Sequence, residues 1–269
     1  MTLPATAAPE SNGPQTVRLQ LPAVRPLLTY ALLAAIISIY IVQYLIDQTG
    51  DPTQVNPLLN WGVLDYGRVL LDGEWYRLLS AMFLHLSPIH IFFNAYALWR
   101  FGSFVEMTFG HLRFGLIYFL GGLSGSLASL IIGRGASAGA SGAIFAIIAA
   151  EMVFLYYHRE LLGVRAGQRL RELLILAAIN LALGVVSSTG ISAQQIDNWD
   201  HIGGFFGGLL LAALIAPHFA LDSTPGEAPR IVDQTPFRSR WPLALIGALL
   251  LLIIALLAAH GLPVPAYSS

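Results

Sequence analysis

Residues 139–157 read GASGAIFAIIAAEMVFLYY, a turn of small residues that leads into a long apolar run. Before its tyrosine end, the run carries only two polar side chains, Ser141 and Glu151. A serine that glycine and alanine flank at the head of a helix leaves room for another group to approach its hydroxyl. The composition of the chain decides which surroundings this serine has.

The chain is 56% hydrophobic and only 11% charged over 269 residues, whereas a soluble domain is about 25% charged. We therefore predict an all-α polytopic membrane protein with the lipid bilayer as its surroundings. A formal net charge of −1 gives no reason to expect nucleic acid as a partner. The absence of cysteine excludes disulfides, thiolate metal sites and cysteine nucleophiles, and we expect no metal and no cofactor.

Hydrophobic runs predict seven helices across a hydrocarbon core of about 30 Å. They cover residues 26–46, 87–101, 114–133, 138–157, 173–188, 201–221 and 241–261. Ser87 and Pro88 match an N-cap and a first-turn proline, and set the start of the second helix. Between the first two helices, the stretch 47–77 is long for a loop and is expected to have structure of its own.

These runs divide the chain into four parts. Residues 1–23 lack apolar periodicity and are predicted to form a disordered cytoplasmic tail, and residues 24–221 form a six-helix core. Residues 222–240, rich in proline and glycine, are predicted to be a cytoplasmic linker. Residues 241–269 form the seventh helix and a short external tail.

The distribution of arginine predicts the orientation. If the N-terminus is cytoplasmic, the inner segments hold 11 arginines and the outer segments hold three, as the positive-inside rule requires. The second, fourth and sixth helices then begin at the outer face, which puts His90, Ser141 and His201 at one depth. A targeting segment is not recognisable, which favours a prokaryotic plasma (inner) membrane.

Each polar residue at this depth also has a structural interpretation. In membrane helices, serine often serves close packing and asparagine joins helices, while a histidine can cap a helix at the interface. His90 and Asn94 lie four residues apart on one helical face, which suits two donors directed at one point. His201 begins the segment HIGGFFGG, in which Gly204 and Gly208 allow a neighbouring helix to come close.

Together these residues also satisfy the requirements of acyl transfer. A serine hydroxyl is a weak nucleophile until a base takes its proton, and a histidine within hydrogen-bond reach is the commonest base. Peptide hydrolysis further needs donors for the developing oxyanion. His90, Asn94 and the backbone N–H groups at the head of the fourth helix could supply them.

The joint spacing of these motifs resembles that of the rhomboid family of intramembrane serine proteases. The resemblance covers about residues 60–217. It rests on GASG at 139–142, on His201 with Gly204 and Gly208, on His85 with His90-xxx-Asn94, on EWYR at 74–77, on Glu106 and on IDNW at 196–199.

The resemblance implies a Ser141–His201 dyad in a water-filled cavity that opens to the exterior, with Ser141 as nucleophile and His201 as general base and acid. His90, Asn94 and the Ser141 backbone N–H would stabilise the oxyanion. The substrate would be a single-pass or other transmembrane protein, cut near the outer end of a helix with small or helix-breaking residues. A seventh helix fits the six-plus-one arrangement of part of the family, and the oligomeric state is left open.

The resemblance also implies structural roles. It assigns them to Arg77, Glu106, His85, Gly139, Gly142, Gly204 and Gly208, and it ties Arg77 to Glu106.

This chain departs from the family pattern at two positions near the dyad. Phe145 stands where some rhomboids have a tyrosine that stacks on the catalytic histidine, so it can stack but cannot donate a hydrogen bond. Asp200 stands where a small or apolar residue is expected. It could complete a triad, but neighbouring residues on a helix point about 100° apart, so it is poorly placed to orient His201.

Two further features allow alternatives. Residues 135–139 read GASAG and match a nucleophile elbow around Ser137, but that motif needs a preceding strand, and no strand period is present. Ser137 is therefore expected to line a loop. Glu151 and Arg100 are expected at similar depth and could pair inside the bundle, or Arg100 could extend to the inner headgroups.

Other classes of function fit the sequence less well. The H-E-x-x-H motif of a zinc protease and a pair of intramembrane aspartates are both absent. A transporter would need polar residues in both membrane halves. The rival that stays open is a catalytically silent rhomboid-like protein that binds membrane helices.

Overall fold

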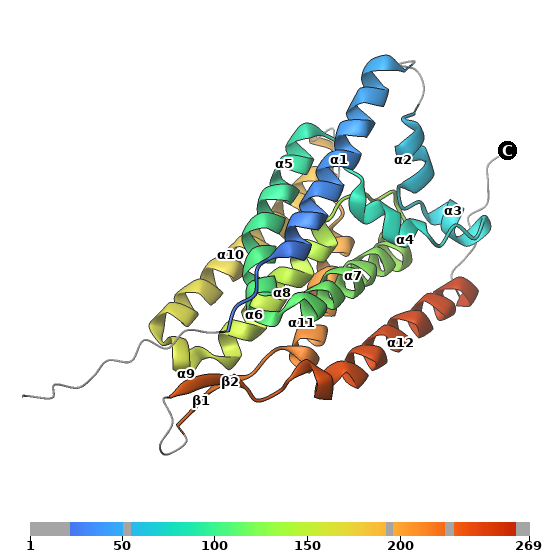
Figure 1. Ribbon diagram of the computed structural model, residues 1–269. Coiled ribbons are helices and arrows are strands. Elements are labelled where there is room, and N and C mark those ends of the chain that lie inside the picture. The colour runs from blue at the N-terminus through green and yellow to red at the C-terminus, as the bar shows by residue number, and fades with distance from the viewer. Residues whose placement is uncertain (1–21, 51–54, 192–195, 224–228, 262–269) are drawn as a thin grey trace, which may run out of the picture.

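The computed structural model describes residues 22–50, 55–191, 196–223 and 229–261, and it is almost entirely helical (Figure 1). The predicted N-terminal tail, apart from its last two residues, and the external tail beyond residue 261 lie outside the described residues. The elements are α1 (Leu27–Thr49), α2 (Pro57–Gly62), α3 (Tyr66–Leu71), α4 (Arg77–Ser80), η1 (Ala81–Phe83), α5 (Pro88–Ala97), η2 (Leu98–Gly102), α6 (Ser103–Phe109), α7 (His111–Ala128), η3 (Ser129–Gly133), α8 (Ser141–Tyr157), α9 (Arg159–Leu162), α10 (Val164–Val186), η4 (Ser187–Ile191), α11 (Asn198–Ile215), β1 (Phe219–Asp222), β2 (Arg230–Asp233) and α12 (Phe237–Gly261).

Local sequence signals explain where two of the important helices begin. The Ser87 hydroxyl accepts a hydrogen bond from His90 N at 3.3 Å, and Pro88 occupies the first turn of α5, as predicted. The Asp197 carboxylate accepts from the backbone N–H groups of Trp199 and Asp200, at 3.0 and 3.1 Å, and so caps α11. Both caps satisfy N–H groups that a helix cannot satisfy internally.

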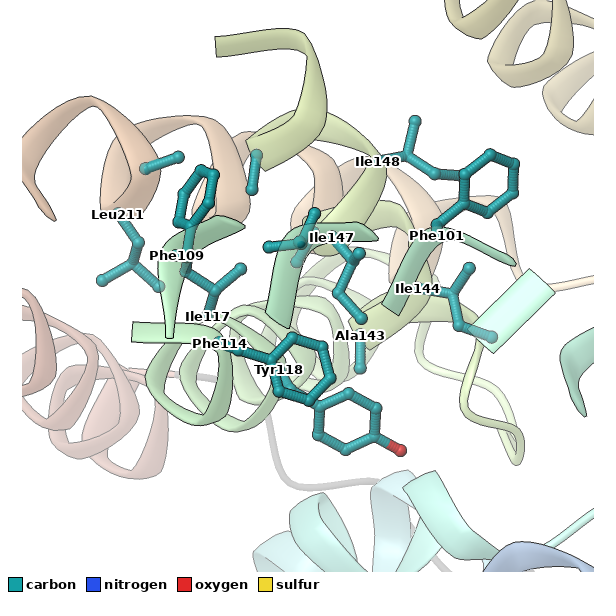
Figure 2. Close-up of a cluster of buried hydrophobic side chains, with 14 of the residues drawn as sticks. Phe101, Phe109, Phe114, Ile117, Tyr118, Ala143, Ile144, Ile147, Ile148 and Leu211 are labelled. Carbon is teal, nitrogen blue, oxygen red and sulfur yellow. The ribbon is translucent and has the colours of Figure 1, made fainter. Parts of the chain in front are cut away.

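Helices α7, α8 and α11 pack against one another at the centre of the molecule, and α8 is buried along nearly its whole length. The core around α8 draws apolar side chains from α7, α11 and the segment from η2 to α6. Figure 2 shows part of this cluster, in which Ile144, Ile147 and Ile148 of α8 lie among rings such as Phe114 and Tyr118. Because α8 contacts protein on every side, its apolar residues show no single hydrophobic face.

Four single helices in the described part of the chain are long and apolar enough to cross a bilayer, namely α1, α7 with η3, α10 with η4, and α12. A fifth span results if Arg77–Phe83 and Pro88–Phe109, bent by 93°, are counted as one. The apolar helix α8 is shorter, at 17 residues. The chain is thus an all-α polytopic membrane protein, and each of the seven predicted hydrophobic runs contains a helix.

Two regions between the long helices have structure of their own. The stretch between α1 and α5 forms α2, α3 and α4, whose apolar side chains pack against Leu127 and Leu130 at one end of α7 and η3. After α11, β1 and β2 pair antiparallel, with Phe219 opposite Asp233 and Asp222 opposite Arg230. This hairpin lies at the same end of the bundle as α9 (Figure 1). β2 lies in the predicted linker, whereas β1 takes the last three residues of the run predicted as the sixth helix, which ends at Ile215 instead; no strand was expected at either place.

Candidate active site

The site lies where α8 and α11 come closest. A Cβ atom built on Gly204 would lie 2.1 Å from the carbonyl oxygen of Gly142, and one on Gly208 would lie 2.3 Å from Cα of Ala146. Both distances are too short for any side chain, so the two backbones touch only because these positions are glycine. The small-residue face predicted for the sixth helix therefore does face the fourth helix.

His201 lies one turn before Gly204 on this same face, which brings it level with the head of α8. Its ring stacks on Phe145, with centroids 4.3 Å apart and planes 11° apart. The side chain is buried, and its Nδ1 atom has no hydrogen-bond partner in the described part of the chain. Phe145 therefore holds the plane of the imidazole by apolar contact alone.

The hydroxyl of Ser141 lies at the N-terminus of α8 and donates a hydrogen bond to Oδ2 of Asp200, at 3.4 Å. Within the described residues, no hydrogen bond joins Ser141 to His201. Asp200 likewise makes its side-chain contact with the serine, and no hydrogen bond to the neighbouring imidazole is present among the described residues. The geometry thus gives no support to Asp200 as the third member of a triad.

Gly139 places His90 beside the serine. The backbone of Gly139 has φ of +136°, a region that L side chains rarely adopt, and a Cβ atom there would lie 2.8 Å from Nε2 of His90 and 3.6 Å from the Ser141 hydroxyl oxygen. The imidazole of His90 therefore reaches the turn that carries Ser141. Asn94, one helical turn further along α5, is buried, and its Nδ2 donates to the carbonyl oxygen of His90 at 3.1 Å.

His85 is held from a helix that sequence analysis did not connect with the site. The side chain of Gln43 on α1 donates to the carbonyl oxygen of His85 at 3.1 Å and accepts from its N–H at 3.3 Å. The His85 ring, itself buried, packs edge-on against His90 with centroids 5.0 Å apart. Gln43 could have been noticed as an amide within the first hydrophobic run, where a polar side chain needs a partner.

The predicted tie between Arg77 and Glu106 is wrong. Arg77 is buried and binds the Glu74 carboxylate at 2.5 Å, with further hydrogen bonds to the carbonyl oxygens of Val63 and Asn60. Arg77 thereby holds the end of α2 and the residues that follow it against α4. All these partners lie within 17 residues of Arg77 in the sequence, because the chain there folds back on itself in short helices.

Glu106 instead joins α6 to the start of α1. Its carboxylate accepts from the N–H of Leu28 at 2.8 Å and from the N–H and hydroxyl of Thr29, both at 2.6 Å. It also lies 2.6 Å from Nδ1 of His111. A carboxylate at a helix N-terminus satisfies N–H groups that lack partners within the helix, so Glu106 does have a structural role, with α1 as its partner.

The sequence left open whether Glu151 pairs with Arg100, and the structure gives Glu151 another partner. Glu151 is buried on α8 and forms an ion pair with Arg169 of α10 at 2.8 Å. Arg169 also binds Glu172 at 3.1 Å, while Arg100 is exposed. Arg169 could not be recognised from depth alone, because it lies 18 residues further along the chain, between two of the predicted hydrophobic runs.

Ser137 lies in the loop before α8. Its backbone N–H and carbonyl oxygen pair with Leu64, at 3.0 and 2.9 Å, in an isolated antiparallel bridge. The strand that a nucleophile elbow would need is not found in the described residues before it. No group of three or more histidine, aspartate or glutamate side chains in the described residues could hold a metal ion.

Comparison with known proteins agrees with this architecture. The Rhomboid domain family model matches residues 72–218, more than half of the chain. Rhomboid protease GluP of Bacillus subtilis (strain 168) is 35% identical over 191 residues, which cover 71% of this chain and 35% of that protein. RHOMBOID-like protein 2 of Arabidopsis thaliana is 34% identical over 191 residues, or 67% of this chain and 58% of the relative.

The chain therefore belongs to the rhomboid family. It spans between about one third and three fifths of the length of the relatives named above. The matched segment runs from the loop before α4 to just beyond α11. It includes the predicted site residues Ser141, His201, His90 and Asn94, whereas Gln43 lies outside it.

Proposed function

We propose that this protein is an intramembrane serine endopeptidase that cuts transmembrane substrates in or near the outer end of a helix. The observation that carries the proposal is the contact between α8 and α11, where Gly204 against Gly142 brings His201 to the level of Ser141. Membership of the rhomboid family and similarity to a rhomboid protease support hydrolysis of peptide bonds as the reaction.

In the proposed reaction, Ser141 and His201 act as a dyad. The Ser141 oxygen attacks the scissile carbonyl carbon while Nε2 of His201 takes the hydroxyl proton. His201 then gives this proton to the leaving amine, the C–N bond breaks and an acyl-enzyme remains. Water, deprotonated by His201, hydrolyses the ester and restores the serine. Stacking on Phe145 restricts the imidazole to one plane during these transfers.

The oxyanion of each tetrahedral intermediate needs donors that are already in place. The backbone N–H of Ser141 is at the first position of α8, where an N–H has no partner within its own helix. His90 lies beside the same turn, and Asn94 is buried one turn further on. We assign all three donors to the oxyanion, with His85 and Gln43 supporting the position of His90.

The proposed substrates are single-pass or other membrane proteins whose helices carry small or helix-breaking residues near the outer end. Such a segment unfolds at a low free-energy cost, because glycine and proline destabilise the interior of a helix. We further propose that the protein lies in a prokaryotic plasma membrane with its N-terminus in the cytoplasm, so that the site opens to the exterior.

The rival function is a catalytically silent protein that binds membrane helices. One observation favours it, since the Ser141 hydroxyl bonds to Asp200 rather than to His201 in this structure. The proposed protease and this rival differ in one measurable quantity, the hydrolysis of a peptide bond that depends on Ser141.

The test is cleavage of a transmembrane reporter by purified full-length protein in detergent. Wild type is expected to cut the reporter, and Ser141→Ala and His201→Ala are expected to lose cleavage by at least about a thousandfold, as removal of a nucleophile or its base does elsewhere. Thermal unfolding of each variant shows whether the fold survives.

Ser137→Ala is the matched control, because Ser137 contributes its backbone to the bridge with Leu64 and its side chain has no assigned role. We expect it to retain wild-type cleavage. Equal cleavage by wild type and Ser141→Ala would refute the dyad. No cleavage by any form, together with binding of the reporter, would favour the silent helix-binding protein.

A further inference from the structure

Asp200 is a buried carboxyl group in contact with the proposed nucleophile. Its Oδ2 atom lies 3.4 Å from the Ser141 oxygen and accepts the hydroxyl hydrogen bond. A Cβ atom on Gly142 would lie 2.5 and 2.6 Å from the two carboxyl oxygens, and one on Gly125 would lie 2.7 Å from Oδ1. The carboxyl group therefore fills a space that glycines of α7 and α8 leave open, directly beneath the head of α8.

This position separates Asp200 from the residue next to it in sequence. His201 faces Phe145, whereas the side chain of Asp200 points into the junction of α7, α8 and α11. The cap formed by Asp197 fixes the first turn of α11, and with it the directions in which the side chains of Asp200 and His201 point. Asp200 consequently acts on the serine, and no described contact lets it orient the imidazole.

A serine hydroxyl has one proton, so it can donate to one strong acceptor at a time. If Asp200 is a carboxylate, it takes the hydrogen bond that His201 must receive before it can act as a base. If Asp200 is a neutral acid, its own O–H can donate to the Ser141 oxygen and engage a lone pair needed for attack. In the first state, the contact keeps the serine proton from His201, and in the second it occupies a lone pair of the nucleophile.

We propose that Asp200 is a positioning residue that holds Ser141 in a resting arrangement and competes with His201 for the serine hydroxyl. This inference rests on the proposed function. The 3.4 Å contact is long for a hydrogen bond between oxygens, so the restraint is weak enough for a bound substrate to break. Asp200 thus slows the reaction of Ser141 without preventing it.

The test is the rate at which a fluorophosphonate probe labels the full-length protein in detergent, with Ser141→Ala as background. Asp200→Ala removes the competing group and is expected to speed labelling by about two- to tenfold, the range that one net hydrogen bond accounts for. Asp200→Asn keeps the volume but accepts more weakly than a carboxylate, so a smaller increase is expected.

Asp72→Asn is the matched control, because it makes the same carboxylate-to-amide change at an exposed position at the end of α3, a residue with no role in the site. It is expected to leave the labelling rate unchanged. Asp200→Ala also opens space beside Ser141, so the increase in Asp200→Asn, which keeps the volume, separates positioning from easier access of the probe.

Unchanged or slower labelling of both Asp200 variants, with wild-type thermal stability, would overturn the inference. If Asp200→Ala does not fold, the Asn variant decides. Absence of labelling in wild type and in every variant would instead overturn the proposed function.

Discussion

At the scale of single residues, Gly139 controls the turn that presents Ser141, the proposed nucleophile. Its φ of +136° lies where an L side chain is strained, and an added Cβ atom would press on Nε2 of His90 at 2.8 Å. Both effects act on the same turn. The glycine therefore allows His90 and Ser141 to share one small volume, which is what oxyanion stabilisation requires.

We predict that Gly139→Ala slows both reporter cleavage and fluorophosphonate labelling. Strained backbone conformations of this kind cost about 1–3 kcal/mol, so a reduction of about five- to a hundredfold is expected. Gly135→Ala is the matched control in the same loop, because a Cβ atom there would meet nothing within 4 Å. Equal rates for the two variants would show that Gly139 does not position the serine.

The sequence predicted several of these residues because their surroundings are local. Phe145 lies four residues after Ser141 and so on the same side of α8, and His201 precedes Gly204 and Gly208 on one face of α11. Partners that come from distant segments were missed. A buried carboxylate such as Glu106 can be satisfied by any donor, and the N–H groups of α1 that satisfy it carry no signature in the sequence.

At the scale of elements, the β1–β2 hairpin is tied to the bundle at two points. Arg113 of α7 binds the Asp233 carboxylate of β2 at 2.9 Å. His158, which directly follows α8, accepts a hydrogen bond from the N–H of Phe219 in β1 at Nε2, at 2.9 Å, and its Nδ1 lies 2.7 Å from the Phe154 carbonyl oxygen. Only a neutral imidazole can accept the first and donate the second.

We predict that acid weakens the attachment of this hairpin. Burial lowers the pKa of His158 below its usual value of about 6.5, so the unfolded chain binds a proton at a higher pH than the folded chain does. The free energy that the neutral ring contributes is fully present above about pH 6.5, and it is lost as the pH falls toward the lower pKa of the folded state.

Thermal unfolding between pH 7.5 and 5 measures this effect. The midpoint is expected to fall by about 2–4 °C for each kcal/mol lost, and the fall is expected to be smaller in His158→Gln, which does not titrate. That comparison separates His158 from His218, whose ring centroid lies 6.2 Å away. Asp233 does not titrate in this pH range. Burial alone would raise its pKa, but hydrogen bonds from Thr235, Arg113 and His218 outweigh burial and lower the pKa below its usual value. A parallel fall in both proteins would contradict the prediction.

Hydrophobic period and length predicted the apolar part of each long helix, but α10 begins at Val164, nine residues before the predicted run, because its first turns are polar. The hairpin could not be predicted in the same way. Its two strands have four residues each and are separated by a segment with prolines and glycine, so the composition indicates a linker. What makes strands of them is tertiary contact, with His158 for β1 and Arg113 for β2.

At the scale of the whole molecule, the distribution of charge predicts the orientation across the membrane. The bundle has two ends, separated by α8, whose 17 residues span about 25 Å. The loop before α8 carries Arg134, whereas the segment after it carries Arg159, Arg165, Arg169 and Arg171. The positive-inside rule predicts that the second end lies in the cytoplasm and that the head of α8, with Ser141, faces the exterior.

The absence of cysteine makes this orientation directly testable, because an introduced cysteine is the only thiol in the chain. Gly135 and Gly167 lie at opposite ends of α8, and a Cβ atom on either would meet nothing within 4 Å. We predict that a membrane-impermeant maleimide labels Gly135→Cys in intact bacterial spheroplasts, and labels Gly167→Cys only after lysis. Retained reporter cleavage shows that each variant is folded. The reverse pattern would place Ser141 at the cytoplasmic face and would require substrates to be cut near their inner ends.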